Sequence, residues 1–402
     1  MFHQLLREGD MHTTISSEKI PIRLWLDDME EGALQQARNL ANLPFAFHHI
    51  AIMPDAHFGY GMPIGGILAT RDEVIPNALG VDIGCGMCAV KTSLESLHRS
   101  ELKQVMKSIR ATIPLGFKRH KKPLPHTFMP EMSDTLRANR MLIIEREYEN
   151  ARKQVGTLGG GNHFIEIQQG GGGDIWFMIH SGSRNLGYQV ARHYNKLAGN
   201  LNKKNRSPVP AAWQLAHLHL SSDEGQRYLH EMNYCVQFAY ANRMAMCKRV
   251  EEALIENVTP EITFSEPINI AHNYAAPETH YGTNVCIHRK GATRAEPDEI
   301  GIIPGSQGSA SYIVRGKGNP ESFSSCSHGA GRKLGRKQAQ RTLNLEHEKK
   351  ILDEKGIIHA IRGKRDLEEA ASAYKNIDEV LARQKDLVEI IEVLQPLAVI
   401  KG

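Results

Sequence analysis

A carboxylate and a thiol lie three residues apart in a glycine-rich segment of the sequence, residues 80–86. The glycines around Asp82 and Cys85 can adopt backbone angles that other residues avoid, so both side chains can point to one place. A carboxylate and a thiolate that converge repel each other unless a cation lies between them. The segment therefore predicts two ligands of a metal site, although taken alone it is more typical of a turn with an inert, buried cysteine.

Three histidines elsewhere extend this ligand set. His163 begins a predicted strand after a glycine-rich loop, and His180 and His272 each follow a short apolar run typical of a strand. Neutral imidazoles, a thiolate and a carboxylate form a reasonable ligand set for one or two transition metals, and a thiolate can bridge two ions. Two neighbouring metal ions suit phosphoryl transfer, because they stabilise both the attacking and the leaving oxygen. Each histidine alone fits a core or surface position, but the combination favours a metal site.

His328 has a different setting, between Ser327 and Gly329 and before a predicted basic helix with Arg332 near its start. A neutral imidazole is a competent nucleophile, and phosphate binds well at a helix N-terminus. His328 is therefore a candidate to attack a nucleotide phosphorus, with Arg332 stabilising the developing charge. The alternative is that His328 only caps or packs against the helix. Asp55, just past a predicted strand end, is a second candidate for polar chemistry.

Helices and strands must position these residues, and most predicted strands end in polar or glycine residues. Apolar periodicity predicts helices over 30–42, 97–110 and 136–154, and a mainly helical layer or insertion over about 186–256. The predicted strands cover 49–53, 87–90, 175–179, 262–264, 268–270 and 285–287, with a further one ending at 303. Beyond Arg332 we expect a mainly helical chain. Because the candidate residues run from 55 to 332, the pattern favours one α/β domain (α+β type) over residues 1–402.

Composition bounds the class of protein. The chain has 402 residues, 41% hydrophobic and 23% charged, which is ordinary for a globular protein. It has no apolar run long enough to span a membrane and no signal peptide at its start. Six cysteines are too few for a disulfide scaffold in so long a chain, so we expect reduced thiols and a cytoplasmic protein. The net charge of +4 decides little, but basic clusters at 118–122, 203–206 and 332–337 could meet a phosphate backbone.

Six segments of the sequence together resemble the RtcB family of RNA-splicing ligases. They are Asp82-Ile83-Gly84-Cys85, Gly160-Gly161-Asn162-His163-Phe164-Ile165-Glu166, His180-Ser181-Gly182-Ser183-Arg184, Arg289-Lys290-Gly291-Ala292, Pro304-Gly305-Ser306 and His328-Gly329-Ala330-Gly331-Arg332. The segment 54–57 and the terminal pair 401–402 are similar to the family as well, so the resemblance covers essentially the whole chain.

The resemblance implies a fold, a reaction and two cofactors. The fold would be an unusual α/β architecture in which β-sheets carry the site and helices surround them. The reaction would join RNA ending in a 3′-phosphate or 2′,3′-cyclic phosphate to RNA with a 5′-hydroxyl, using GTP and two Mn²⁺ ions. His328 would attack the α-phosphorus of GTP and become guanylylated. GMP would then move to the RNA 3′-phosphate, and the 5′-hydroxyl would displace it.

The resemblance also assigns residues to roles. Cys85 would bridge the two Mn²⁺ ions, with His180 and His272 completing one site and Asp82 and His163 the other. Asp55 and Arg332 would assist His328 in catalysis. The implied GTP or GMP contacts are Asn162, His163, Phe164, Ile165, Glu166, His272, Asn273, Pro304, Gly305, Ser306, Gln307, Ser311, His328, Gly329, Ala330, Gly331, Tyr374 and Lys401. The implied RNA phosphate contacts are Arg184, Lys290, Arg332 and Arg336. Gln307 is a visible departure, because the family commonly has methionine after Pro-Gly-Ser.

Two other classes of protein compete with this interpretation. A dinuclear metallophosphoesterase that acts on RNA phosphate ends without GTP would need the same metal ligands. It would not need a nucleophilic histidine, so residues 304–311 and 328–332 discriminate against it. A non-enzymatic RNA-binding protein would need the basic clusters but no thiolate among three histidines. A lysine-nucleotide mechanism is not expected, because the sequence contains no Lys-x-Asp-Gly.

Overall fold

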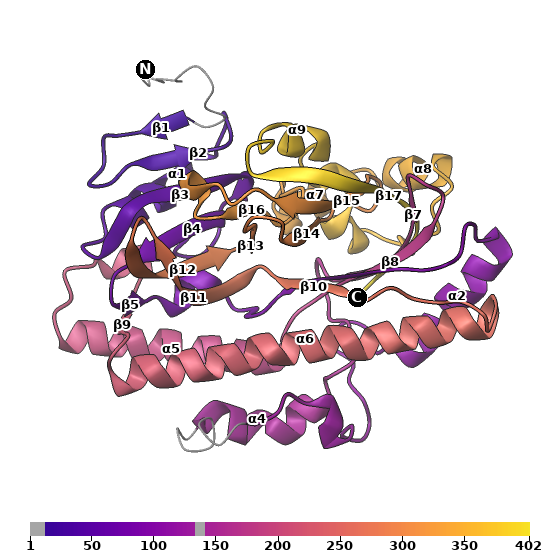
Figure 1. Ribbon diagram of the computed structural model, residues 1–402, viewed down its shortest axis with the longest axis horizontal. Coiled ribbons are helices and arrows are strands. Elements are labelled where there is room, and N and C mark those ends of the chain that lie inside the picture. The colour runs from indigo at the N-terminus through magenta and orange to yellow at the C-terminus, as the bar shows by residue number, and fades with distance from the viewer. Residues whose placement is uncertain (1–12, 133–140) are drawn as a thin grey trace.

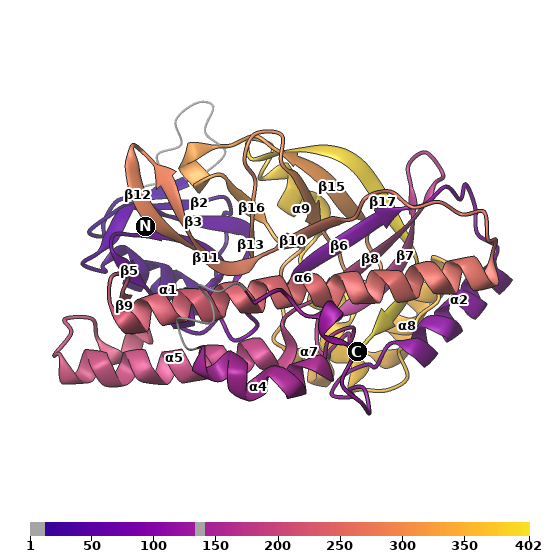
Figure 2. The ribbon, with the colours of Figure 1, turned by 60° about the horizontal axis from the view of Figure 1, so that its bottom comes forward.

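The computed structural model describes residues 13–132 and 141–402 as a mixed α/β fold (Figure 1). Two large β-sheets form the centre, and long helices lie along one side of both sheets (Figures 1 and 2). The α/β class expected from the sequence is confirmed. No helix of the described ranges is long and apolar enough to cross a membrane.

The first large sheet has six strands in the order β1-β2-β3-β4-β12-β11. Its strands are β1 (Thr13–Ile15), β2 (Ile22–Leu24), β3 (Ala46–His57), β4 (Ile64–Thr70), β12 (Thr283–Lys290) and β11 (Asn273–His280). Only the β2–β3 pair is parallel among the described strand pairs of this sheet. The small sheets β5–β9 (Glu73–Val74, Leu218–His219) and β13–β16 (Ala292–Arg294, Ser325–Ser327) are separate two-stranded pairs.

The second large sheet has seven strands in the order β10-β6-β8-β7-β17-β15-β14. Its strands are β10 (Ile268–Ala271), β6 (Gly86–Lys91), β8 (Ile175–Ser181), β7 (Phe164–Gly170), β17 (Val388–Lys401), β15 (Ser311–Gly316) and β14 (Ile300–Ile303). Side chains alternate between the two faces of a strand, and both faces of β8 are covered, since all seven of its residues are buried. Phe177 and Ile179 pack in a core with the helices, while Trp176 and Met178 pack in another core.

Helices cover the sheets. They are α1 (Glu31–Ala41), α2 (Arg99–Thr112), α4 (Leu142–Arg152), α5 (Arg184–Lys204), α6 (Asp223–Asn257), α7 (Arg336–Thr342), α8 (Leu345–Glu354) and α9 (Ile377–Ala382). Helix α6 passes beneath both large sheets, with α5 beside it (Figure 2). Its Met246, Cys247 and Val250 share the core of β6, β7 and β8. That residues 1–402 form one domain, with 186–256 as a helical layer or insertion, stays a prediction.

The chain passes from one large sheet to the other at His272. Strand β10 of the second sheet ends at Ala271, and β11 of the first sheet begins at Asn273. The intervening backbone is held by a hydrogen bond from the His272 N–H to the Cys85 carbonyl, 2.8 Å long. This crossing places His272 beside the glycine-rich segment 80–86, between the two sheets.

Several predicted elements match the structure, and others need correction. The helices expected over 30–42 and 97–110 are α1 and α2, and the described part of 136–154 forms α4, while 136–140 lie outside the described residues. The strand expected over 262–264 is wrong, because Phe264 makes only an isolated bridge to Thr92. The strand expected to end at Met53 continues to His57, so Asp55 lies inside β3.

The C-terminal third departs most from expectation. The sequence predicts a mainly helical chain beyond Arg332, and α7, α8 and α9 do form there. Residues 388–401 correct that prediction, because they form the 14-residue strand β17, which pairs with both β7 and β15. Proline inside an apolar run argues against a strand, and Pro396 lies inside β17. The register shift between Pro396 and Ala398 accommodates it.

Candidate metal and nucleotide site

Three predicted ligands meet at the ends of neighbouring strands. The candidate ligand atoms of Cys85, His163 and His180 all lie within 4.8 Å of one another, and all three residues are buried. The Cys85 Sγ is 3.4 Å from His163 Nε2 and 3.3 Å from His180 Nε2. Strand β8 lies between β6 and β7, with His180 opposite both Met87 and Phe164, so the sheet register brings the three side chains together.

Backbone carbonyls fix the tautomers of two imidazoles. His163 Nδ1 lies 3.0 Å from the Leu158 carbonyl oxygen, and His180 Nδ1 lies 3.2 Å from that of Asn162. A carbonyl only accepts a hydrogen bond, so each Nδ1 carries the proton and each Nε2 turns a lone pair toward Cys85. This arrangement is typical of histidines that bind metal ions.

Asp82 and His272 complete the convergence expected from the sequence. Asp82 Oδ2 lies 3.0 Å from His163 Nε2, and an acceptor nitrogen facing a carboxylate is unfavourable unless a proton or cation lies between them. The His272 ring centroid is 5.2 Å from that of His180. His272 Nδ1 is buried without a hydrogen-bond partner in the described chain. An unpaired buried nitrogen, a thiol and a carboxylate form a donor set that fits a transition metal.

Burial sets the protonation of this cluster. It lowers the pKa values of His180 and His272 well below the ordinary value, with nearby histidines adding to the effect, so both imidazoles are neutral ligands. Burial, and then the Asp82 carboxylate, raise the pKa of the Cys85 thiol. A bound metal ion reverses that direction, because a coordinating thiol is deprotonated.

His328 is held beside this cluster by Asp55. Its Nδ1 lies 2.6 Å from Asp55 Oδ2, which also accepts the His328 backbone N–H at 3.2 Å. The proton therefore sits on Nδ1, and Nε2 is left with the lone pair that a nucleophile needs. The His328 and His272 ring centroids are 4.8 Å apart. Gly291 makes room, since a Cβ there would lie 3.0 Å from the His328 ring.

The helix expected just after His328 is absent from the structure. Residues 328–335 are irregular, and α7 begins only at Arg336 and has seven residues. The prediction of a phosphate site at a helix N-terminus beside His328 is therefore wrong. A glycine-rich turn comes directly after His328 instead. In this turn Gly331 has φ +72° and approaches the Asp55 backbone so closely that a Cβ would lie 2.1 Å from its carbonyl oxygen.

A cavity of about 2020 Å³ joins the cluster to most of the predicted polar contacts. Of the predicted site residues, its lining includes Asp82, Cys85, Asn162, His163, Arg184, His272, Asn273, Lys290, Gln307, His328, Arg336 and Lys401. The other predicted residues, among them Asp55, Glu166, His180, Arg332 and Tyr374, are not part of this lining. Ile165 points away from it, into the core beneath the helices.

The C-terminal strand brings Lys401 next to Glu166. Lys401 pairs with Phe164 in the β17–β7 register, its Nζ lies 5.2 Å from the Phe164 ring centroid and donates to the Asn162 carbonyl at 3.3 Å. Burial raises the pKa of Glu166 to about 8, against the opposing effects of its hydrogen bond from Gln168 and the charge of Lys401. Glu166 is therefore largely protonated near neutral pH in the absence of a ligand.

Glu369, which no sequence motif indicated, organises the arginine side of the cavity. Its buried carboxylate pairs with Arg332 Nη1 at 3.2 Å and Arg336 Nε at 3.1 Å, and it accepts the Tyr374 hydroxyl. The Glu369 carbonyl accepts the side-chain amide of Gln307 at 2.6 Å. Only the tertiary fold brings Glu369 to these partners, so local pattern could not have found it.

The serine loop and the other two predicted phosphate contacts are also held by hydrogen bonds. Ser311 Oγ accepts the Gly305 N–H at 3.2 Å, and Ser306 Oγ lies 2.9 Å from Ser309 Oγ. Arg184 donates to the Gly116 carbonyl at 2.8 Å while lining the cavity. Lys290 is buried and donates to the Tyr60 and Met62 carbonyls at 2.6 and 3.1 Å. The Lys290 side chain therefore anchors the backbone of the Tyr60–Met62 loop, and burial lowers the pKa of its amine to about 7.

The fold and the site are those of a mixed α/β protein with a buried candidate transition-metal centre. The family model for the tRNA-splicing ligase RtcB matches residues 36–402. The RNA-splicing ligase RtcB of Escherichia coli K12 is 36% identical over 408 residues, which cover 96% of this chain and 99% of the relative. The tRNA-splicing ligases RtcB of Thermococcus kodakarensis and Methanococcus maripaludis are 30% and 31% identical, each covering 96% of this chain and 95% of the relative. The chain belongs to the RtcB family.

Proposed function

We propose that this protein is a GTP- and Mn²⁺-dependent RNA ligase that works through a guanylylated His328. It would join RNA 3′-phosphate or 2′,3′-cyclic phosphate ends to 5′-hydroxyl ends, in RNA repair or tRNA splicing. Membership of the RtcB family supports the reaction class. The observation that carries the mechanism is the position of His328, held by Asp55 with Nε2 free, beside the convergent metal ligands.

In the first step, His328 Nε2 attacks the α-phosphorus of GTP, a phosphorus–nitrogen bond forms, and pyrophosphate leaves. Asp55 keeps the proton on Nδ1 and stabilises the positive charge that the imidazole gains. Water first opens a 2′,3′-cyclic end to the 3′-phosphate by breaking the phosphorus–O2′ bond. An oxygen of the RNA 3′-phosphate then displaces His328 from the α-phosphorus. The 5′-hydroxyl finally attacks the RNA phosphate, and GMP leaves.

The metal ligands divide as the family resemblance implies. Cys85, His180 and His272 would hold one Mn²⁺, and Asp82, Cys85 and His163 the other. Bound there, two ions would neutralise charge on the phosphate oxygens and the leaving group. The orphaned His272 nitrogen and the inward-facing Nε2 atoms support this assignment.

GMP would lie between the Phe164–Lys401 end of strands β7 and β17 and the irregular segments 304–311 and 328–331. Ionised Glu166 would accept hydrogen bonds from the guanine edge, and Lys401 would compensate its charge. Tyr374, Ser306 and Ser311 would complete the pocket. The Arg332–Arg336–Glu369 cluster would face the phosphates. A cytoplasmic location stays a prediction.

Labelling with α-labelled GTP tests the proposal. When Mn²⁺ is present and RNA is absent, the protein should take up label from GTP, because guanylylation precedes RNA binding. A phosphorus–nitrogen bond should lose its label in acid and keep it in base. Unlabelled protein, or sealing of 3′-phosphate RNA without any nucleotide, would contradict the mechanism. The second result would favour the metallophosphoesterase alternative.

A further inference from the structure

The cavity extends well beyond the proposed metal and GMP contacts, along helix α5. This helix begins at Arg184, shortly after His180 of β8, and runs away from α7 and the C-terminus (Figure 2). The cavity lining includes positions 188, 195, 199, 202 and 203 of α5. Their spacing puts them on one face of the helix. With 21 residues, α5 is about 30 Å long, far longer than a nucleotide needs.

The basic residues of α5 that line this cavity are Arg184 at the helix start and Lys203 near its end, and no carboxylate of the same helix balances them. Helix α5 contains five Lys and Arg residues and no Asp or Glu. Lys203 and Arg206, at its C-terminal end, line the cavity and are exposed. Neither makes an ion pair with a described carboxylate. Such a wall attracts a polyanion.

Two exposed tyrosines lie on the same cavity. Tyr188 is 42% exposed and Tyr60 is 74% exposed. Large aromatic rings in water next to a basic wall are typical of sites where nucleic-acid bases stack. Hydrogen bonds hold the segments that carry the two rings. Lys290 donates to the Tyr60 carbonyl, and Asn195 of α5, the helix that carries Tyr188, donates to the Asn77 side chain.

We propose that the α5 arm of the cavity binds a single-stranded RNA segment leading to the metal centre. Bases stack on Tyr60 and Tyr188, and phosphates meet Lys203 and Arg206. This inference rests on the proposed function, for which it supplies the path of the RNA. A duplex hides the faces of its bases, so the tyrosines select single strands. Because every base has an aromatic face, the arm tolerates different sequences.

Binding of a 3′-phosphorylated single-stranded RNA and of a blunt duplex, measured by fluorescence anisotropy over a range of salt, tests the proposal. Tyr60→Ala with Tyr188→Ala should weaken single-strand binding about tenfold or more, with little effect on the duplex. Tyr188→Trp should retain affinity. Lys203→Ala with Arg206→Ala should reduce the slope of the logarithm of single-strand affinity against the logarithm of salt concentration by about 1.4. Lys103→Ala with Lys107→Ala, exposed on α2, is the matched control and should change neither quantity.

Labelling by α-labelled GTP separates failure of this inference from failure of the proposed function, because guanylylation uses no RNA. A tyrosine double variant that is labelled normally yet binds single-stranded RNA like the wild type overturns the inference. Equal losses for single strand and duplex overturn it as well. Wild-type protein that takes no label refutes the ligase mechanism instead.

Discussion

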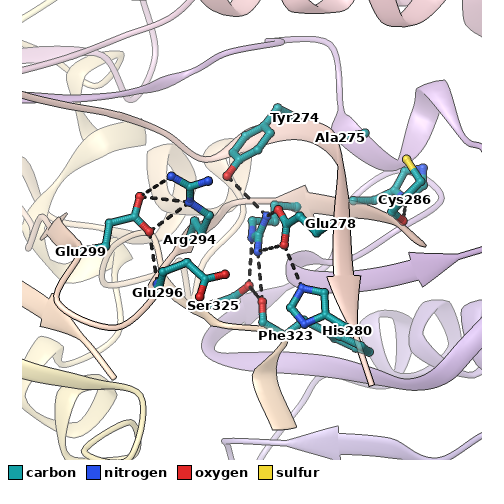
Figure 3. A network of polar contacts seen from close by, with 12 residues as sticks. Tyr274, Ala275, Glu278, His280, Cys286, Arg294, Glu296, Glu299, Phe323 and Ser325 are labelled. Atoms are coloured by element: carbon teal, nitrogen blue, oxygen red, sulfur yellow. Dashed lines mark hydrogen bonds and ion pairs between the residues drawn. The ribbon is translucent and has the colours of Figure 1, made fainter. Parts of the chain in front are cut away.

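The candidate metal cluster around Cys85 and a second buried polar cluster differ in how their hydrogen-bond donors and acceptors are paired. The second cluster surrounds the guanidinium of Arg289 on β12, and Figure 3 shows Tyr274, Glu278, His280 and Ser325 gathered there. Arg289 donates to Ser325 Oγ at 2.9 Å, to the Phe323 carbonyl at 3.0 Å and to both carboxylate oxygens of Glu278. Its donors therefore face acceptors on several sides.

The electrostatics of the two clusters differ in the same way. Burial would raise the pKa of Glu278, but the hydrogen bond from His280 and the charge of Arg289 outweigh it and hold the pKa at about 2. In the metal cluster, Cys85 and its neighbouring imidazoles instead turn lone pairs toward one point. A saturated buried network stabilises the fold, whereas converging unsatisfied acceptors mark a place for a cation.

The short motif Arg289-Lys290-Gly291 illustrates this difference, because its three residues make three different kinds of contact. Arg289 closes the saturated network, Lys290 anchors the backbone of the loop that presents Tyr60, and Gly291 makes room for His328. Sequence resemblance marks these residues together, and only the structure separates their contacts.

The largest effect is expected from Cys85→Ser. A serine hydroxyl stays protonated where a metal-bound thiol ionises, so ligation and guanylylation should be lost and Mn²⁺ content should fall. Elemental analysis and labelling measure both. Cys88→Ser is the control, because Cys88 is buried three residues further along and contacts Cys247 instead. Full metal content in the Cys85→Ser protein would contradict the proposed role of Cys85 as a bridging ligand.

Glu278→Gln should damage stability and spare the metal site. Removing one partner of a buried ion pair lowers the free energy of unfolding by about 3–5 kcal/mol. Glu299→Gln is the comparison, because Glu299 forms a more exposed pair with Arg294, and its loss should be under about 1 kcal/mol. Urea denaturation measures the two losses, and elemental analysis measures the metal. If Glu278→Gln lost metal while keeping its stability, the two clusters would not be separable in this way.

Lys401→Met should weaken GTP binding about tenfold to a hundredfold, since a hydrogen bond to a charged group is worth about 1.5–3 kcal/mol. The methionine keeps strand β17 and its pairing with β7, so the melting temperature should change little. Calorimetric titration with GTP and Mn²⁺ gives the affinity, and Lys103→Met provides a surface control. Equal GTP affinities in Lys401→Met and wild type would make the C-terminal lysine a bystander.

Glu166 should make stability fall as pH rises. Its folded pKa of about 8 lies above the ordinary value of 4.5, so the folded protein binds more protons between these values and loses stability there by up to ~1.4 kcal/mol per pH unit. Thermal unfolding of nucleotide-free protein between about pH 5 and pH 8 measures this slope. Glu166→Gln should flatten it. An unchanged slope in Glu166→Gln would assign the pH dependence to other groups.

The convergence of Cys85, His163 and His180 was easier to predict from sequence than the arrangement of the proposed nucleotide contacts, for a physical reason. Cys85, His163 and His180 lie at the ends of buried strands β6, β7 and β8, which local apolar runs reveal. The nucleotide side depends on contacts between distant segments. Strand β17 contains a proline and exists through its pairing with β7 and β15, and Glu369 reaches Arg332 only in the folded chain. Local pattern carries no information on such pairings.

His328→Ala, tested with two substrates, examines the central claim most directly. The variant should lose all label from α-labelled GTP while keeping its fold and metal content, because His328 is not among the proposed ligands. It should still seal an RNA whose 3′-phosphate has been guanylylated chemically beforehand, since that substrate bypasses the histidine. Labelling of His328→Ala by GTP would contradict the account.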